Sequence, residues 1–151
     1  MKTMYLVSCV SQKAVTPRPA EDLYESDWFR KARRYVLRQM RPGDEWFILS
    51  AEHHLLPPAR EIAPYDTTLI RMSKSDRERW GEVVLKQLLH KLSAEDRIVV
   101  LAGARYRETL VPALRALQYS VRIPMDHLPI GKQKAWLLEH IQRPELDCES
   151  A

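Results

Sequence analysis

Three short apolar runs, separated by segments with helical periodicity, constrain the fold of this chain more than any other feature of its sequence. The runs occupy residues 4–8, 46–50 and 97–102, and the first two stop at a serine. Apolar runs of this length, bounded by polar or turn residues, are typical of buried strands. A shorter run at 121–123 is expected to form one more strand, which makes about four strands in the chain.

The segments between these runs have the period of amphipathic helices. Ser26 is placed to cap a helix that ends at Pro42-Gly43. The apolar side chains that share one face of this helix are Phe29, Ala32, Val36 and Met40. Three further helices are expected from the same periodicity and from capping residues, namely Ser73 or Ser75 to about Leu92, 107–118, and a last helix that follows Gly131 and ends by Pro144.

Strands that alternate with helices predict an α/β fold. We expect a three-layer sandwich with a mostly parallel, about four-stranded central sheet. The length of 151 residues fits one domain, which we place at 1–143, with 144–151 as a flexible C-terminal tail. Ligands of such sheets bind beyond the carboxyl ends of the strands. The loops after Ser8, Ser50 and Ala102, with the segment 129–132, therefore form the predicted wall of the site.

Composition and missing motifs exclude several classes of protein. The two cysteines, Cys9 and Cys148, lie near opposite ends of the chain and lack the spacing of metal ligands, so no disulfide framework, metal or cofactor is expected. No phosphate loop, dinucleotide fingerprint or zinc-deaminase pattern occurs in the sequence. No apolar run approaches the ~20 residues of a membrane span, and the first residues lack a secretion signal, so we expect a cytoplasmic protein.

The charge distribution points to an anionic partner. The net charge is +4, and one face of the first expected helix carries Arg30, Arg34, Arg38 and Arg41. Such a face is suited to a phosphate backbone, although exposed helices are also commonly charged. Gly103, Arg105 and Tyr106 add a cation and an aromatic ring at a strand end, a pairing that can hold a phosphate and stack on a base. Nucleic acid, most plausibly DNA, or a nucleotide is thus the expected partner.

Four residues are candidates for chemistry. Lys13 can neutralise a phosphate or act as an amine nucleophile, or it is a solvated loop lysine. His53 suits a general acid, or it bonds to the loop backbone. Asp22 and Asp66 lie in turns, where carboxylates often bind backbone amides, but either can stabilise an oxocarbenium-like centre. Glu52-His53-His54 is a poor metal cage because adjacent side chains point in different directions.

Several motifs resemble, in the same order, those of a bacterial and phage family of domains of unknown function. They are Ser8-Cys9-x-x-x-Lys13, Pro19-Ala20-x-Asp22-Leu23-Tyr24-x-Ser26-x-x-Phe29-x-Lys31-Ala32-Arg33, Leu49-Ser50-Ala51-x-His53, Pro64-Tyr65-Asp66, Leu101-Ala102-Gly103-x-x-Tyr106 and Ile130-Gly131-Lys132-Gln133-x-x-Trp136-Leu137. This chain departs from the family's pattern at two positions. His54 stands where the family usually has glycine, and Val10 stands where a serine usually follows the cysteine.

The family's signature is similar to that of the archaeosine synthase domain, and its layout to the uracil-DNA glycosylase-like fold. The resemblance implies a nucleobase-processing, DNA glycosylase-like hydrolase, with phage defence or phage DNA metabolism as its setting. It assigns catalysis to Lys13, Asp22, His53 and Asp66. From these motifs together with their neighbours in the loops, we expect substrate binding by Ser8, Cys9, Ser11, Tyr24, Ser50, His54, Tyr65, Gly103, Arg105, Tyr106 and Lys132. The alternatives are a non-catalytic nucleic-acid-binding module and an enzyme that modifies free nucleotides or 7-deazaguanine-type bases.

Overall fold

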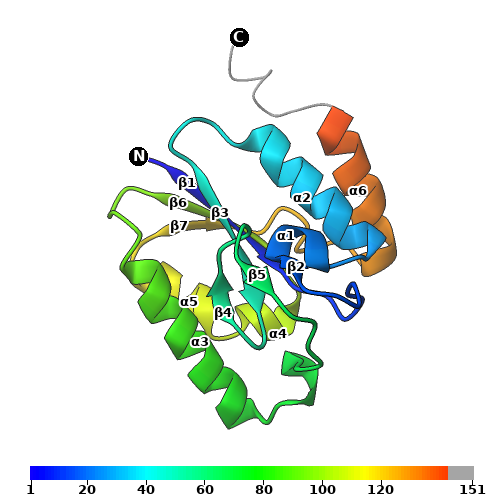
Figure 1. Ribbon diagram of the computed structural model, residues 1–151. Coiled ribbons are helices and arrows are strands. Elements are labelled where there is room, and N and C mark those ends of the chain that lie inside the picture. The colour runs from blue at the N-terminus through cyan, green and yellow to red at the C-terminus, as the bar shows by residue number, and fades with distance from the viewer. Residues whose placement is uncertain (143–151) are drawn as a thin grey trace.

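The computed structural model describes residues 1–142, with a five-stranded sheet at its centre (Figure 1). The strand order is β4-β3-β1-β6-β7. Four of the strands are parallel, namely β1 (Thr3–Ser8), β3 (Glu45–Ser50), β6 (Arg97–Leu101) and β7 (Ser120–Arg122). These are the strands that the apolar runs predict, and the α/β class with a mostly parallel sheet is confirmed.

A fifth strand corrects the predicted count of four. The edge strand β4 (His54–Leu56) pairs antiparallel with β3, with Leu55 opposite Leu49. The sequence predicts a loop after Ser50 because three residues are too few to show the alternation of a strand. The chain doubles back at His54, whose φ of 61° is in the left-handed region, and the pairing then buries Leu55 and Leu56.

Helices cover both faces of the sheet (Figure 1). One face carries α2 (Asp27–Gln39) and α6 (Ile130–Gln142), which pack on each other. The other face carries α3 (Lys74–Leu89), α4 (Ala104–Arg107) and α5 (Leu110–Ala116). The remaining elements are short: α1 (Ala20–Leu23), the 3-10 turn η1 (Leu69–Arg71), and the antiparallel pair β2 (Arg18–Pro19) and β5 (Glu61–Ile62).

The predicted caps are present, and one predicted helix is divided. Ser26 Oγ accepts the N–H of Phe29 at 3.0 Å, and Ser73 Oγ accepts the N–H of Asp76 at 3.1 Å. The helix expected over 107–118 is instead two helices, α4 and α5. Pro112 explains the break, because its ring has no N–H and clashes with the carbonyl four residues earlier, at Glu108. The tail expected at 144–151, like Pro144, lies outside the described residues.

The end of α5 supports a stability prediction. Gln118 has a φ of 72°, its N–H donates to the Arg115 carbonyl at 2.9 Å, and the next N–H, of Tyr119, donates to the Leu114 carbonyl at 3.1 Å. This is a Schellman cap, whose left-handed position favours glycine. Gln118 is exposed, so Gln118→Gly should raise the free energy of unfolding by about 1 kcal/mol. Urea unfolding measures this gain, and an unchanged or lower value contradicts the prediction.

Candidate functional site

Backbone pairing brings the loop after β1 back to the end of the sheet. Lys13 and Tyr24 form an antiparallel bridge, the N–H of Ala14 donates to the Leu23 carbonyl at 2.8 Å, and the N–H of Glu25 donates to the Gln12 carbonyl at 2.9 Å. These bonds place Lys13 beside Tyr24. The β2–β5 pair holds the same loop to the segment that precedes Tyr65. Loops that follow different strands therefore meet at one place.

Lys13, Tyr24, Ser50, His53 and Tyr65 meet there and form what we call the Lys13 cluster. Lys13 Nζ lies 4.4 Å from the ring centroid of Tyr65 and 5.8 Å from that of Tyr24. The ring of Tyr65 meets the rings of Tyr24 and His53 edge to face, with centroid distances of 6.4 and 5.3 Å. A lysine amine over aromatic faces makes a cation–π contact while it is charged.

A chain of hydroxyl groups connects the cluster to the sheet. The hydroxyl of Tyr65 lies 2.6 Å from that of Tyr24 and 2.7 Å from Ser50 Oγ. Ser50 is fully buried at the end of β3, and its Oγ accepts the N–H of His53 at 2.9 Å. The serine hydroxyl is therefore held between the turn that carries His53 and the ring of Tyr65. This network fixes the positions of both tyrosine rings.

The electrostatics of the cluster set which groups are charged. Burial, reinforced by the charge of Cys9 when it is ionised, raises the pKa of Tyr24 and of Tyr65 far above the ordinary tyrosine value. Both hydroxyls therefore remain protonated at neutral pH and can donate hydrogen bonds. Burial lowers the pKa of Lys13, while negative charge on Cys9 and Asp66 opposes this effect. A lysine with a lowered pKa is a more available amine nucleophile.

A second set of contacts extends the cluster toward β6 and α3. The hydroxyl of Tyr106 lies 3.2 Å from Cys9 Sγ, and burial raises its pKa as it does for the other two tyrosines. The ring of Trp80 meets that of Tyr106 edge to face at 5.5 Å, and its Nε1–H donates to the Ser50 carbonyl at 2.9 Å. Trp80 is not among the predicted site residues, because the helical period at this position gives no sign of this hydrogen bond.

The two candidate carboxylates have different surroundings. Asp22, on α1, forms an ion pair with Arg33 at 3.0 Å. Asp66 is exposed and follows Tyr65 directly in the chain. Its negative charge raises the pKa of Lys13 and so favours the charged amine. The structure therefore associates Asp66, and not Asp22, with the Lys13 cluster.

His54 stands in a conformation that glycine adopts most readily. Its φ of 61° is in the left-handed region, where glycine carries no steric cost. The ring of His54 stacks on Trp80 at a centroid distance of 6.4 Å, and both residues line an open hollow of about 340 Å³. Burial, with the charge of His53, lowers the pKa of His54, and Glu52 opposes the shift.

The backbone of His54 gives a second stability prediction. Histidine is tolerated at a φ of 61°, whereas a β-branched side chain clashes with its own backbone there. His54→Val should lower the free energy of unfolding by about 2 kcal/mol, and His54→Gly should leave it nearly unchanged. Guanidinium unfolding of the two variants tests this, and equal losses for both would show that the side-chain contact with Trp80, not the backbone, controls stability.

The other predicted binding residues lie around this centre. Ser8 is buried at the end of β1, and Ser11 is exposed, with its carbonyl 3.4 Å from Lys13 Nζ. Arg105 is exposed and forms an ion pair with Glu108 at 3.3 Å. Gly103 lines a hollow of about 170 Å³. Exposed Lys132, in the first turn of α6, precedes Gln133, which lines the same hollow.

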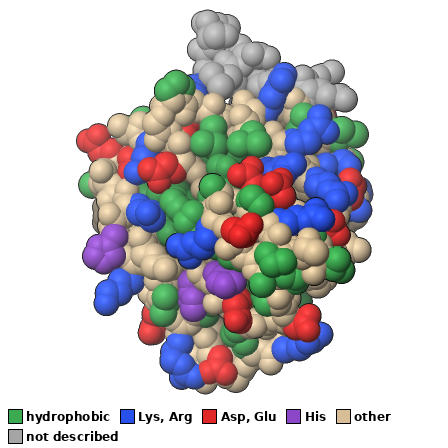
Figure 2. Space-filling model, in the orientation of Figure 1, with side chains coloured by type: hydrophobic (Ala, Val, Ile, Leu, Met, Phe, Trp, Pro, Cys, Tyr) green, Lys and Arg blue, Asp and Glu red, His purple; other side chains and the backbone are tan. Residues whose placement is uncertain are grey.

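The four predicted backbone-binding arginines do not form one surface at the site. Arg30, Arg34 and Arg38 are exposed along α2, and Figure 2 shows Lys and Arg side chains gathered on the side where α2 and α6 lie. Arg41 follows the end of α2 and lines a hollow at the opposite end of the sheet. The helix ends at Gln39, so Arg41 does not continue the face of the other three.

Within residues 1–142, no three His, Cys, Asp or Glu side chains come together as a metal-binding group. None of the helices in the same range combines the length and the apolar character that a membrane crossing requires.

Among known proteins, a family profile matches this chain, whereas no curated protein or solved structure does. One family profile matches residues 4–139, which include both strands that lead into the Lys13 cluster. The expectation of a domain of unknown function is thereby confirmed. The chain belongs to the family of unknown function DUF6884.

Proposed function

We propose that the protein is a nucleobase-processing enzyme, a glycosylase-like hydrolase acting on DNA, with Lys13 as its nucleophile. The observation that carries this proposal is the position of the Lys13 amine. It lies half-buried beyond the carboxyl end of β1, 4.4 Å from the ring of Tyr65, where burial lowers its pKa. Because its pKa is lowered, more of this amine is in the neutral form that can attack an electrophilic carbon.

The proposed reaction uses three residues of this site. The Lys13 nitrogen forms a bond to C1′ of the nucleoside as the C1′–N bond breaks, and the base leaves with that electron pair. His53 gives the departing base a proton, and Asp66 takes the proton that the attacking amine loses. Opening of the sugar ring then gives an iminium link to Lys13, which water hydrolyses to an abasic site and free amine.

The walls of the cluster suit an extruded base. Aromatic rings from Tyr65 and His53 offer surfaces on which a base can stack. The hydrogen bonds of the Tyr65 hydroxyl to Tyr24 and Ser50 hold this ring in place for stacking. Base extrusion costs a few kcal/mol, and the exposed arginines of α2 can offset this cost through phosphate contacts. In this proposal the chain is remotely related to the uracil-DNA glycosylase-like and archaeosine synthase domains. Its biological setting is phage defence or phage DNA metabolism.

The test uses duplex and single-stranded oligonucleotides that carry ordinary or modified bases, including 7-deazaguanine types. Reaction should leave alkali-labile abasic sites, and borohydride should trap a covalent protein–DNA complex by reducing the iminium. The same assay is run in parallel on free nucleotides that carry the same bases. If only the free nucleotides react, the substrate is a nucleotide and not DNA.

The second candidate is a non-catalytic nucleic-acid-binding module. The exposed arginines of α2 favour it, because phosphate contacts by themselves give affinity that falls with salt. Salt-sensitive DNA binding with neither base release nor a trapped complex on any substrate would support this module and reject the glycosylase.

A further inference from the structure

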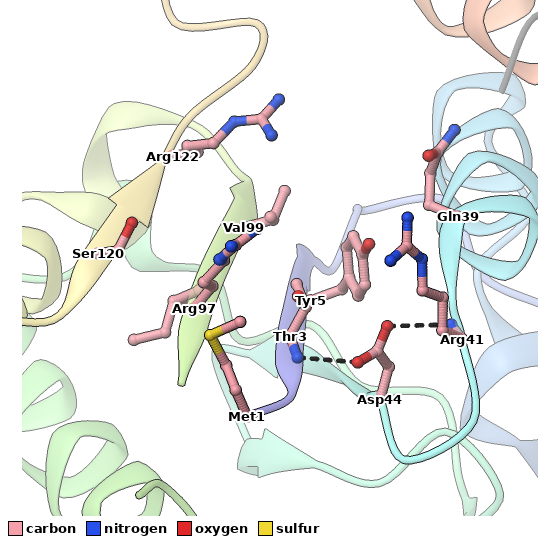
Figure 3. Close-up of a pocket in the computed structure, with 11 residues that line it drawn as sticks. Met1, Thr3, Tyr5, Gln39, Arg41, Asp44, Arg97, Val99, Ser120 and Arg122 are labelled. Carbon is pink, nitrogen blue, oxygen red and sulfur yellow. Dashed lines mark hydrogen bonds between the residues drawn. The ribbon is translucent and has the colours of Figure 1, made fainter. Parts of the chain in front are cut away.

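A hollow of about 310 Å³ lies at the end of the sheet opposite the Lys13 cluster (Figure 3). The first residues of three strands line it, at Thr3, Arg97 and Ser120, whereas the Lys13 cluster lies beyond the last residues of β1 and β3. Its volume is at the lower end of the range for small-molecule sites. No residue of the proposed reaction contributes to it.

Strand register places two arginines on the floor of this hollow. Tyr5 pairs with Val99, which pairs with Arg122, and Arg97 lies two residues before Val99 on β6. Side chains two residues apart on a strand point to the same face of the sheet. Arg97 and Arg122 therefore rise from neighbouring strands on the face that α2 covers. Figure 3 shows them on one side of the hollow, with Tyr5 between them and the end of α2.

The opposite wall supplies a third arginine and a buried amide. Arg41 and Gln39 line this side (Figure 3). Gln39 is only 6% exposed, and its Nε2 has no hydrogen-bond partner within the described residues. A buried amide without a partner costs about 1–3 kcal/mol, and such a group in a native fold calls for a ligand or another partner.

The one carboxylate among the lining residues is engaged with the backbone. Asp44 accepts the N–H of Thr3 at 2.8 Å and the N–H of Arg41 at 2.9 Å. It therefore fixes the turn that carries Arg41 against the start of β1. Among the described residues that line the hollow, the charged side chains are three guanidinium groups and the Asp44 carboxylate.

We propose that this hollow is a second ligand site, which binds a small molecule carrying a phosphate group. Arg97 would contact the phosphate oxygens, because the planar guanidinium fork matches them, and Arg41 and Arg122 line the same hollow. The free Nε2–H of Gln39 would donate to the same group. This site is independent of the proposed reaction, and Lys13→Met should leave its affinity unchanged.

Isothermal titration calorimetry with pyrophosphate and with adenosine monophosphate, at constant ionic strength, tests this site. Arg97→Gln and Gln39→Leu should each weaken binding by about tenfold, the effect of losing a charged or buried hydrogen bond. Arg34→Gln is the matched control, since it removes an exposed arginine of α2 outside the hollow, and it should change affinity less than twofold. Circular dichroism verifies that each variant is folded.

A further experiment tests whether carboxylates of the chain itself compete with the added ligand. Glu145, Asp147 and Glu149 lie in the sequence beyond the described residues, and a full-length variant with Gln, Asn and Gln at these positions removes their charge. Binding by either full-length protein that depends on Arg97 supports the site. Binding only after neutralisation would also identify these carboxylates as competitors. Absence of binding to both proteins overturns the proposal, as does an equal loss in Arg34→Gln and Arg97→Gln.

Discussion

Replacing Lys13 by methionine is expected to abolish the borohydride-trapped complex and to lower the rate of base release by about 10³-fold or more. Methionine keeps the length and apolar character of the side chain but has no amine to form the bond to C1′. Single-turnover measurements on the preferred oligonucleotide give the rate directly. The aromatic rings around position 13 should stay in place, since Tyr24 and Tyr65 are held by their own hydrogen bonds.

Two controls make this result specific. Lys13→Arg retains the positive charge but not the nucleophilic amine, so it should retain DNA binding and lose trapping. Lys74→Met removes an exposed lysine at the start of α3 and should change neither. Full activity in Lys13→Met would show that the amine is not the nucleophile, even if DNA remains the substrate.

The pH dependence follows from the lowered pKa of Lys13. Only the neutral amine attacks, so the rising limb of the pH–rate profile should report Lys13 and lie below the ordinary lysine value of 10.5. The need for a protonated His53 should make the rate fall again at higher pH. The negative charge of Asp66 holds the pKa of Lys13 up, against the effect of burial. Asp66→Asn should therefore move the rising limb to lower pH, and it should reduce the maximal rate because the proton acceptor is lost. If the rising limb of Asp66→Asn stays at the wild-type pH, the charge of Asp66 does not influence the pKa of Lys13.

The largest expected effect on stability comes from Asp96. This residue is only 3% exposed, and its carboxylate accepts the N–H of Lys2 at 3.0 Å and that of Ser93 at 2.8 Å. It thereby ties the start of β1 to the turn before β6. Asp96→Ala leaves both donors without an acceptor and should lower the free energy of unfolding by about 2–3 kcal/mol. Urea unfolding at pH 7 measures this, with exposed Glu95→Ala as the neighbouring control.

The contribution of Asp96 should also depend on pH. Burial by itself would raise its pKa, but the hydrogen bonds from Ser93 and Lys2, with nearby positive charge, outweigh burial and lower the pKa. A carboxyl with a lowered pKa in the folded state stabilises the protein above its unfolded pKa of ~3.9, and the contribution is lost as pH falls through the folded value. The difference between wild type and Asp96→Asn should therefore shrink below about pH 4. A constant difference from pH 7 to pH 2 would contradict this mechanism.

The candidate site was predictable in part, and the reasons differ between residues. Lys13 and His53 follow strands that the apolar runs reveal, and the carboxyl ends of parallel strands meet at one edge. The contact between Tyr24 and Tyr65 was not predictable, because it depends on the Lys13–Tyr24 bridge and on the β2–β5 pair. Both pairings are too short to leave a pattern in the sequence.

The second hollow shows the same limit more strongly. Arg97 and Arg122 lie far apart in the chain, and each looks like an ordinary charged residue at a strand end. Only the pairing of β6 with β7 brings them to neighbouring strands, and only the end of α2 adds Gln39 opposite them. Arg41 was predicted to act with the other arginines of α2, but the helix ends before it.

The sequence by itself determined the elements whose causes are local. Apolar runs predicted the four parallel strands, Ser26 and Ser73 or Ser75 were predicted to cap helices, and the motifs indicated a domain of unknown function. The tertiary structure alone decided the edge strand β4, the association of Asp66 rather than Asp22 with Lys13, and the arginines that share a hollow. The physical reason is that periodicity and capping act over one or two turns of chain, whereas these outcomes depend on which distant segments pair.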